Sequence, residues 1–352
     1  MKPISSVACC ALLGVLATIG CSGGDSATAP PSDVDFSAGK PRTYEATLLP
    51  LPQSATSSKA AAINAKGQIV GLVGGKAVRW DQGALPVELG IFPGHESSYP
   101  IGISDDGDVL GAGVPPQIEP HIDSHVLRWP ASGGIEDLGE MCCDAISSAA
   151  ISGKGEVAWV GWVSGAIQGL PALHLLRHGT LTSFEVPEEG FSLGLRVVIN
   201  DHSTVGAGEL VWSSHAGWTP LVSAYNNPGT VEITDINNRG DIVAEDVIVE
   251  DSKGTLYPSK GTPVPLEADF IPTSINDFGV ITGRTAEGEA RLRYPDGTIV
   301  GLPTPSGFGA GPVSLSFTDI NDAGIVVGTV LGPIGGVQVQ RAAIWRPVPG
   351  SH

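Results

Sequence analysis

A short pattern of apolar and turn-forming residues recurs seven times along the chain. Each copy places an isoleucine before Asn or Ser, two variable residues and, in six copies, Gly, and an apolar run follows. Self-similarity with a period of about 40 to 50 residues indicates a repeat architecture in which each copy is one supersecondary unit. The seven isoleucines, spaced by 40, 48, 48, 37, 39 and 45 residues, are Ile63, Ile103, Ile151, Ile199, Ile236, Ile275 and Ile320.

Each copy of this motif predicts a tight β-hairpin. Asn at the first turn position can hydrogen-bond the backbone two residues further on, and the Gly accepts a positive φ. The flanking residues are apolar and β-branched, as in Ile325-Val326-Val327, which is typical of strands. In the fourth copy Ser203 replaces the Gly, and we expect a distorted turn there.

A third and a fourth strand are expected after each hairpin. The third ends in a bulky ring, and a ring at one position of every copy indicates packing between neighbouring sheets. The rings are Trp80, Trp129, His178, Trp212, Tyr257, Tyr294 and Trp345. The fourth strand ends in an apolar residue in six copies, at Leu89, Leu138, Phe184, Leu221, Leu266 and Leu302. The seventh copy stops at Trp345-Arg346-Pro347, before a fourth strand.

The segment from Tyr44 to Leu51 has the character of the missing strand. Pairing it with the last three strands would close a ring and hide two sheet edges. Four-stranded units of this length are typical of propeller blades. We therefore predict an all-β, seven-bladed β-propeller over residues 43–349, closed by the N-terminal strand. An open solenoid would need capping repeats, and the sequence offers none.

The third strands also carry a family resemblance. His125-Val126-Leu127-Arg128-Trp129, His174-Leu175-Leu176-Arg177-His178 and Arg341-Ala342-Ala343-Ile344-Trp345 resemble the His-Ala-Phe-x-Trp phrase of the extracellular HAF-repeat family. The Ile-Asn-x-x-Gly hairpins are similar too, over about residues 44 to 346. No copy has His, Ala and Phe together. The resemblance implies export and a repeat fold, and it implies no reaction.

The N-terminus has the features of an export signal. Lys2 precedes an apolar stretch from Val7 to Gly20, which is shorter than the roughly 20 residues of a membrane-spanning helix. Thr18-Ile19-Gly20-Cys21 resembles a bacterial lipobox, so we expect residues 1–20 to be removed and Cys21 to be lipidated. Thr18 departs from the usual Leu, which leaves ordinary cleavage near Gly20 open. Residues 21–42 read as a flexible tether, and the membrane partner would be reached through the lipid anchor, at the outer membrane or cell surface.

Composition excludes one class of partner and raises a question about cysteines. The formal net charge is −18, and nucleic-acid binding would need a basic surface that this chain lacks. Besides Cys9, Cys10 and Cys21, the chain has only Cys142 and Cys143. An exported protein meets oxidising conditions, so we expect this adjacent pair to form a disulfide.

Motifs that would identify a reaction are absent. His121 with His125, and His174 with His178, are each four residues apart, which on a strand is about 13 Å and too far for one metal ion. Asp235-x-Asn237-x-Arg239 faintly resembles a calcium loop, but the hairpin turn already explains Asn237. The chain has no nucleophile elbow, Walker loop or His-Glu-x-x-His. We therefore assign no catalytic residue, metal or cofactor from the sequence.

If a ligand binds, the long loops of a propeller suggest one face for it, because function is often carried by loops on a rigid scaffold. These loops bring to that face His95, Glu96, Tyr99, His121, Asp123, Cys142, Cys143 and Tyr225. The sequence leaves three functions open: a monomeric binding or interaction module for an unidentified extracellular or envelope ligand, which we expect first; an exported propeller enzyme, a hydrolase or lyase on a carbohydrate or lactone; and a scaffold subunit of an envelope complex. Several carboxylates or histidines within about 5 Å at a shared cavity would favour the enzyme.

Overall fold

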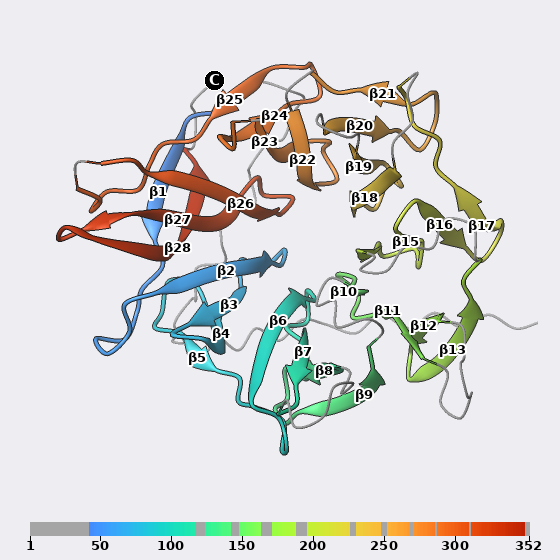
Figure 1. Cartoon of the computed structure of the whole chain (residues 1–352), viewed down its shortest axis with the longest axis horizontal. Helices are drawn as coiled ribbons and strands as arrows, with labels where there is room; N and C mark the ends of the chain where they lie inside the picture. The colour runs from blue at the N-terminus through green and yellow to red at the C-terminus, as the bar shows by residue number, and fades with distance from the viewer. Residues whose placement is uncertain are drawn as a thin grey trace, which may run out of the picture. The chain divides into compact units, whose positions relative to one another are not determined.

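The computed structural model describes residues 42–348 apart from 117–123, 142–147, 163–170, 188–195, 226–229, 248–251, 268–269, 286 and 310. The described strands form seven antiparallel four-stranded sheets, the blades of a β-propeller, which follow one another around a centre (Figure 1). The predicted fold is therefore confirmed. We number the blades 1 to 7 from strand β2 onward, and the first strand of each blade lies nearest the centre.

Each of the first six blades is built from four consecutive strands. Blade 1 holds β2 (Ser58–Ile63), β3 (Ile69–Val73), β4 (Lys76–Trp80) and β5 (Val87–Glu88). Blade 2 holds β6 (Ser97–Ile103), β7 (Val109–Val114), β8 (His125–Trp129) and β9 (Glu136–Glu140). Blade 3 holds β10 (Ala149–Ile151), β11 (Val157–Trp162), β12 (Pro171–Arg177) and β13 (Thr180–Glu185).

The remaining blades follow the same order until the last. Blade 4 holds β14 (Val197–Ile199), β15 (Val205–Ala207), β16 (Leu210–Ser213) and β17 (Gly217–Pro220). Blade 5 holds β18 (Thr230–Ile236), β19 (Ile242–Val247), β20 (Lys253–Tyr257) and β21 (Val264–Pro265). Blade 6 holds β22 (Phe270–Ile275), β23 (Ile281–Thr285), β24 (Ala290–Arg293) and β25 (Ile299–Gly301). Blade 7 holds β26 (Ser314–Ile320), β27 (Val326–Ile334), β28 (Val337–Pro347) and β1 (Tyr44–Leu48).

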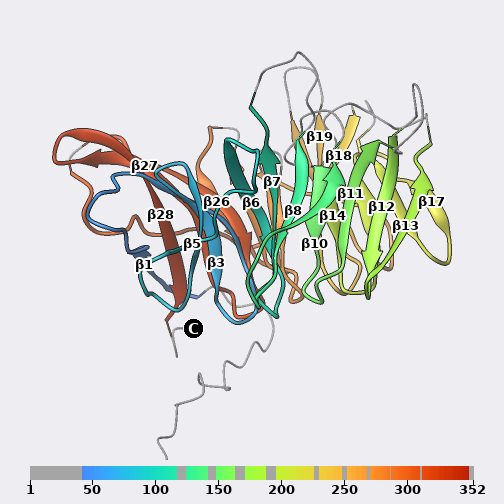
Figure 2. The same ribbon diagram turned by 90° about the horizontal axis from the view of Figure 1, so that it is seen from below.

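Blade 7 joins the two ends of the propeller. Strand β1 pairs antiparallel with β28, with Tyr44 opposite Pro347 and Leu48 opposite Ala343. The amide of Leu49 extends the ladder by donating to the carbonyl of Ala342. In Figure 1 the blue β1 lies beside the red β28, and Figure 2 shows the same two strands from below. The prediction that the N-terminal strand completes the last blade is confirmed.

The rings that end the third strands fasten neighbouring blades together. Trp345 Nε1 donates to the carbonyl of Pro303 at 2.7 Å, and Trp80 Nε1 donates to that of Pro50 at 2.9 Å. Each acceptor directly follows a buried leucine, Leu302 or Leu49, that comes just after the fourth strand of the preceding blade. For Trp80 and Trp345 the predicted packing role is thus confirmed, with a hydrogen bond added to the buried aromatic surface, whereas the buried Trp129 Nε1 makes no hydrogen bond to a described residue.

Two of the seven ring assignments are wrong in detail. In blade 3, Leu176 occupies the position opposite the start of the second strand, and the exposed His178 lies beyond it in the turn to β13, at φ 48°. In blade 6, Arg293 occupies that position opposite Ile281, and the buried Tyr294 follows it. The sequence does not show whether a ring is itself paired or lies one or two residues beyond the paired position, because the length of the turn decides which residue is paired.

The hairpin turns share one hydrogen-bond pattern. In blade 6 the amide of Asn276 donates to the carbonyl of Val280, and the amide of Gly279 donates to that of Asn276. The turn in blade 4 keeps this pattern, because Ser203 itself adopts the positive φ, at 57°. The expected distortion there is absent. The hydroxyl of Ser203 donates to Glu156 at 2.5 Å, a contact that Gly could not make.

A β-bulge in the inner strand explains the glycine that follows the hairpin. In blade 6 the register passes from Pro272 opposite Gly283 to Ser274 opposite Thr282, which leaves Thr273 unpaired. A Cβ on Gly283 would lie only 2.5 Å from the carbonyl oxygen of Ile271. Bulges at the same place occur in blades 1, 2, 5 and 7. Bulges redirect side chains, and here the unpaired residue lies on the wall of the central channel.

Candidate functional site: the central channel

The inner strands of all seven blades enclose a channel of about 930 Å³. This volume lies within the range of pockets that bind small molecules. In every blade the two residues before the motif isoleucine belong to its wall. The bulge is the local reason in five blades, because it inserts an extra residue beside the one that alternation would place there.

At these two positions the wall divides into two parts of opposite character. Blades 1 to 4 supply what we call the apolar arc: Ala61, Ala62, Ile101, Gly102, Ala149, Ala150, Val197 and Val198. Blades 5 to 7 supply the polar arc: Thr234, Asp235, Thr273, Ser274, Thr318 and Asp319. Arg196, just before β14, also lines the channel, and its guanidinium donates to the carbonyl of Thr234 at 3.3 Å. The channel can therefore contact a hydrocarbon group on one side and hydrogen-bonding groups on the other.

Two carboxylates of the polar arc share one hydroxyl. Ser274 Oγ lies 2.7 Å from Asp235 Oδ2 and 3.0 Å from Asp319 Oδ1. Each carboxylate also accepts a backbone amide from the next blade: Asp235 from Ile275 at 2.8 Å, and Asp319 from Ile63 at 2.9 Å. These amide contacts hold the side chains in place and tie blades 5, 6, 7 and 1 together. The trio of Asp235, Ser274 and Asp319 thus has a fixed geometry.

The position of the trio changes its acidity. Burial, reinforced by the negative charge of Asp235, raises the pKa of Asp319 to about 7. Burial also raises the pKa of Asp235, opposed by the hydroxyl of Ser274 and the nearby Arg196. A hydroxyl has one proton to donate, so Ser274 can donate to only one of its two neighbours. A proton held by Asp319 would satisfy the second contact.

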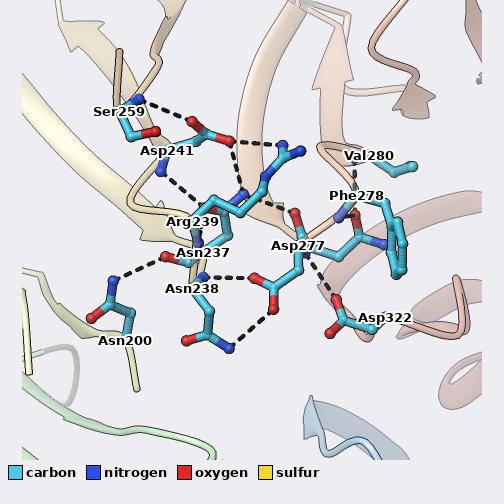
Figure 3. Close-up of polar contacts among 11 residues, drawn as sticks. Asn200, Asn237, Asn238, Arg239, Asp241, Ser259, Asp277, Phe278, Val280 and Asp322 are labelled. Atoms are coloured by element: carbon cyan, nitrogen blue, oxygen red, sulfur yellow. Dashed lines mark hydrogen bonds and ion pairs between the residues drawn. The ribbon is translucent and has the colours of Figure 1, made fainter. Parts of the chain in front are cut away.

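At the hairpin end, a ring of asparagine and aspartate side chains borders the channel. The amide of Asn238 donates to Asp277 Oδ1 at 2.6 Å, and the amide of Asp277 donates to Asp322 Oδ1 at 2.8 Å. Figure 3 shows these contacts passing from one blade to the next. Asp105 and Asp201 occupy the corresponding places in blades 2 and 4 and also line the channel. Burial, together with the charges of Asp277 and Asp105, raises the pKa of Asp322.

The predicted loop face does not coincide with this channel. Of its members, His95, Glu96, Tyr99 and Tyr225 are described, and none of the four is among the residues of the channel wall. The ring of His95 packs edge-on against His125 at 5.1 Å. Tyr225, on the path between blades 4 and 5, donates its hydroxyl to the carbonyl of Gly254 at 2.9 Å. A ligand role for this face stays a prediction; the other members, His121, Asp123, Cys142 and Cys143, lie outside the described residues, as does Cys21.

The histidines and the supposed calcium loop take structural parts where they are described. His125 Nδ1 lies 2.9 Å from Asp137, and His174 stacks on Trp159 with ring centroids 5.0 Å apart. Asn237 accepts the amides of Arg239 and Asp241 within its own turn (Figure 3). Within the described residues, no three His, Cys, Asp or Glu side chains are grouped to hold a metal ion. The same part of the chain contains no helix long and apolar enough to span a membrane.

Sequence reasoning missed the trio, although a signal for it was present. The motif isoleucines of blades 5, 6 and 7 are preceded by Thr-Asp, Thr-Ser and Thr-Asp. In blades 1 to 4 the two preceding residues are apolar or glycine. A comparison of the copies at these two positions would have separated a polar from an apolar part of the ring. Only the closed fold shows that both positions face the channel.

Comparisons with known proteins support the propeller fold and identify no function. No family model and no curated protein matches the chain. Among solved structures, a streptogramin B lyase aligns with a TM-score of 0.55 and 12% identity, covering 87% of this chain and 98% of the lyase. The virginiamycin B lyase from Staphylococcus aureus aligns with 0.55 and 9%, covering 87% and 100%. The β-propeller domain of the Trilobed protease from Pyrococcus furiosus aligns with 0.55 and 14%, covering 83% and 93%. At such identities the likeness concerns the propeller alone.

Proposed function

We propose that this protein is an exported, lipid-anchored binding module that holds a small molecule in its central channel. The observation that carries the proposal is the division of the channel wall into an apolar arc and a polar arc. The two carboxylates also link neighbouring blades, and they give the wall fixed polar groups opposite the apolar arc. Ligand pockets typically combine apolar walls with a few fixed polar groups.

Blocking the channel tests this proposal. Ala61 lines the channel from the bulge of β2 and is half-buried, so Ala61→Phe should fill part of the space while Ala61→Ser should not. Wild type and both variants are screened by thermal unfolding against amines, carboxylates, sugars and lactones. We expect at least one class to raise the melting temperature by a few degrees for wild type and Ala61→Ser, but not for Ala61→Phe. Stabilisation that is equal in all three proteins, or absent throughout, would contradict channel binding.

The anchor is tested separately, because it rests on the sequence. Lipidation at Cys21 would bury acyl chains at about 0.8 kcal/mol for each CH₂ group, enough to make release negligible when more than one chain is attached. Wild type should therefore fractionate with membranes and Cys21→Ser with the soluble material. A wild type that is already soluble would show that the signal is cleaved without lipidation.

A second candidate is an exported enzyme, a hydrolase or lyase acting on a carbohydrate or lactone. The observation in its favour is the trio, because two carboxylates that share one hydroxyl can act as acid and base when one of them holds a proton. A streptogramin B lyase and a virginiamycin B lyase have a similar fold. Turnover of a lactone or glycoside by wild type, lost in Asp235→Asn and Asp319→Asn, would favour the enzyme. Binding without turnover would favour the binding module.

A further inference from the structure

The charges along the channel restrict which ligand it can accept. Among the described residues of the wall, six are aspartates and one, Arg196, is a base. The aspartates are Asp105, Asp201, Asp235, Asp277, Asp319 and Asp322. A channel between low-dielectric walls concentrates the field of such charges, which attracts cations and repels anions. A carboxylate or phosphate ligand would therefore enter against this field.

The hydroxyl donors of the polar arc are already engaged. Thr234 Oγ1 donates to the carbonyl of Val243, and Thr318 Oγ1 donates to that of Val327, both at 3.2 Å. Thr273 Oγ1 lies 2.9 Å from Thr282 Oγ1. These bonds run outward to the second strand of the same blade. The polar arc thus presents mainly acceptors, with Arg196 as the nearby cationic donor, and a ligand suited to the arc must bring its own donors.

The trio lacks one hydrogen-bond donor, which such a ligand could supply. When both Asp235 and Asp319 are ionised, the single proton of Ser274 satisfies one of its two carboxylate contacts. An ammonium group has several N–H donors and a positive charge, and hydrogen bonds between charged groups are the stronger ones. A hydrocarbon portion of the same ligand would lie against the apolar arc.

We infer that the channel binds a small organic cation, a protonated amine whose nitrogen faces Asp235, Ser274 and Asp319 and whose hydrocarbon portion contacts the apolar arc. This inference rests on the proposed channel binding and names its ligand class. It applies equally to a bound ligand and to a substrate held before reaction.

Three probes with the same six-carbon chain test the ligand class: hexylamine, hexanol and hexanoate. Calorimetric titration of the folded wild-type protein at about pH 8 should give hexylamine the highest affinity, about tenfold or more above hexanol, with hexanoate weakest. Asp235→Asn and Asp319→Asn should each lower the affinity for hexylamine about tenfold and leave hexanol unchanged, a selectivity that a folding defect would not produce. Asp106→Asn removes an equal charge from a side chain 92% exposed, outside the channel wall, and should change neither.

The outcomes separate this inference from the proposed function. If hexanol or hexanoate binds as tightly as hexylamine, and Ala61→Phe abolishes that binding, the channel is a binding site but does not select cations. If hexylamine binds wild type and Ala61→Phe equally, the channel is not the site, and both ideas fail. If hexylamine does not bind at millimolar concentration, the inference of a cationic ligand is wrong.

Discussion

The side-chain amide of Asn321 donates a hydrogen bond to the backbone carbonyl of Asn64, at a nitrogen–oxygen distance of 3.0 Å across 257 residues of sequence. The same contact joins Asn237 to Asn276 and Asn276 to Asn321, each time from one blade to the next. The turn residue that the motif requires locally is therefore also a link between blades. In blades 2 and 3 the position holds Ser104 and Ser152, whose shorter side chains bond only within their own turns among the described contacts.

Replacing one of these asparagines should loosen the ring of blades. Asn276→Ser keeps a group that can accept the amide of Val280, as the natural serines do, but loses the bond to Asn321. Because Asn276 is buried and the carbonyl of Asn321 would lose this partner, the free energy of unfolding should fall by about 1–2 kcal/mol. Urea unfolding measures it. The matched control is His202→Ser, an exposed turn position, and an equal effect of both would rule out the inter-blade role.

Deleting the closing strand should cost much more. Removal of residues 43–52 takes away all of β1 and the buried Leu49, and it exposes the edge of β28. Each buried apolar side chain contributes roughly 1.5–3 kcal/mol to the free energy of unfolding. The entropic cost of bringing β1 to β28 rises by only about 0.6 kcal/mol for each doubling of the length of chain between them. Calorimetry should show a sharply lower melting temperature, and light scattering should show association through the open edge.

The comparison for this deletion is removal of residues 22–41, the predicted tether, which should change neither the melting temperature nor the oligomeric state. If the two truncated proteins melt at the same temperature, β1 does not determine the stability of the ring.

Much of the fold could be predicted because its signals are local and repeated. A hairpin is predicted by the types and spacing of Ile275, Asn276 and Gly279. The strand that completes the last blade is predicted because only six of the seven copies have a fourth strand. The site could not be derived in this way. Asp235 and Asp319 are 84 positions apart in the numbering. They come together on Ser274 because blades 5, 6 and 7 pack side by side and a bulge directs these positions to the channel. Periodicity identifies the strand but does not reveal the bulge.

The bulge itself predicts the effect of adding one carbon atom opposite it. In Gly283→Ala the new Cβ would lie 2.5 Å from a backbone oxygen and from the ring of Phe270, so β22 or the core of blade 6 must move. Overpacking of this kind costs about 1–3 kcal/mol, measurable by urea unfolding. Gly309→Ala, whose nearest atom would be 3.6 Å away, should be nearly neutral. A Gly283→Ala protein as stable as the Gly309→Ala protein would mean that the strands adjust without cost.

The last prediction concerns pH and the trio. The strands that pack against β26 carry few charged side chains among the described residues: Lys59, Arg284, Arg291 and Arg293. Lys59 is exposed, and each of the three arginines is paired with an acid. The acidity of Asp319 is therefore controlled chiefly by burial and by Asp235, which together raise its pKa to about 7, against about 3.9 in an unfolded chain. Between these two pH values the native protein holds a proton that the unfolded chain has lost.

That proton stabilises the native state, so its contribution is fully present below about pH 4 and is lost as the pH rises through about 7, by at most about 1.4 kcal/mol per pH unit. Asp319→Asn keeps a neutral side chain that can still donate to Ser274 at every pH. Its free energy of unfolding, measured relative to wild type, should therefore rise between about pH 4 and 7 and level off above that range. Asp106→Asn, on the exposed turn of blade 2, should show no such rise. Parallel profiles for wild type and Asp319→Asn would show that Asp319 is ionised throughout, and that the second contact of Ser274 is made without a proton from the carboxyl group.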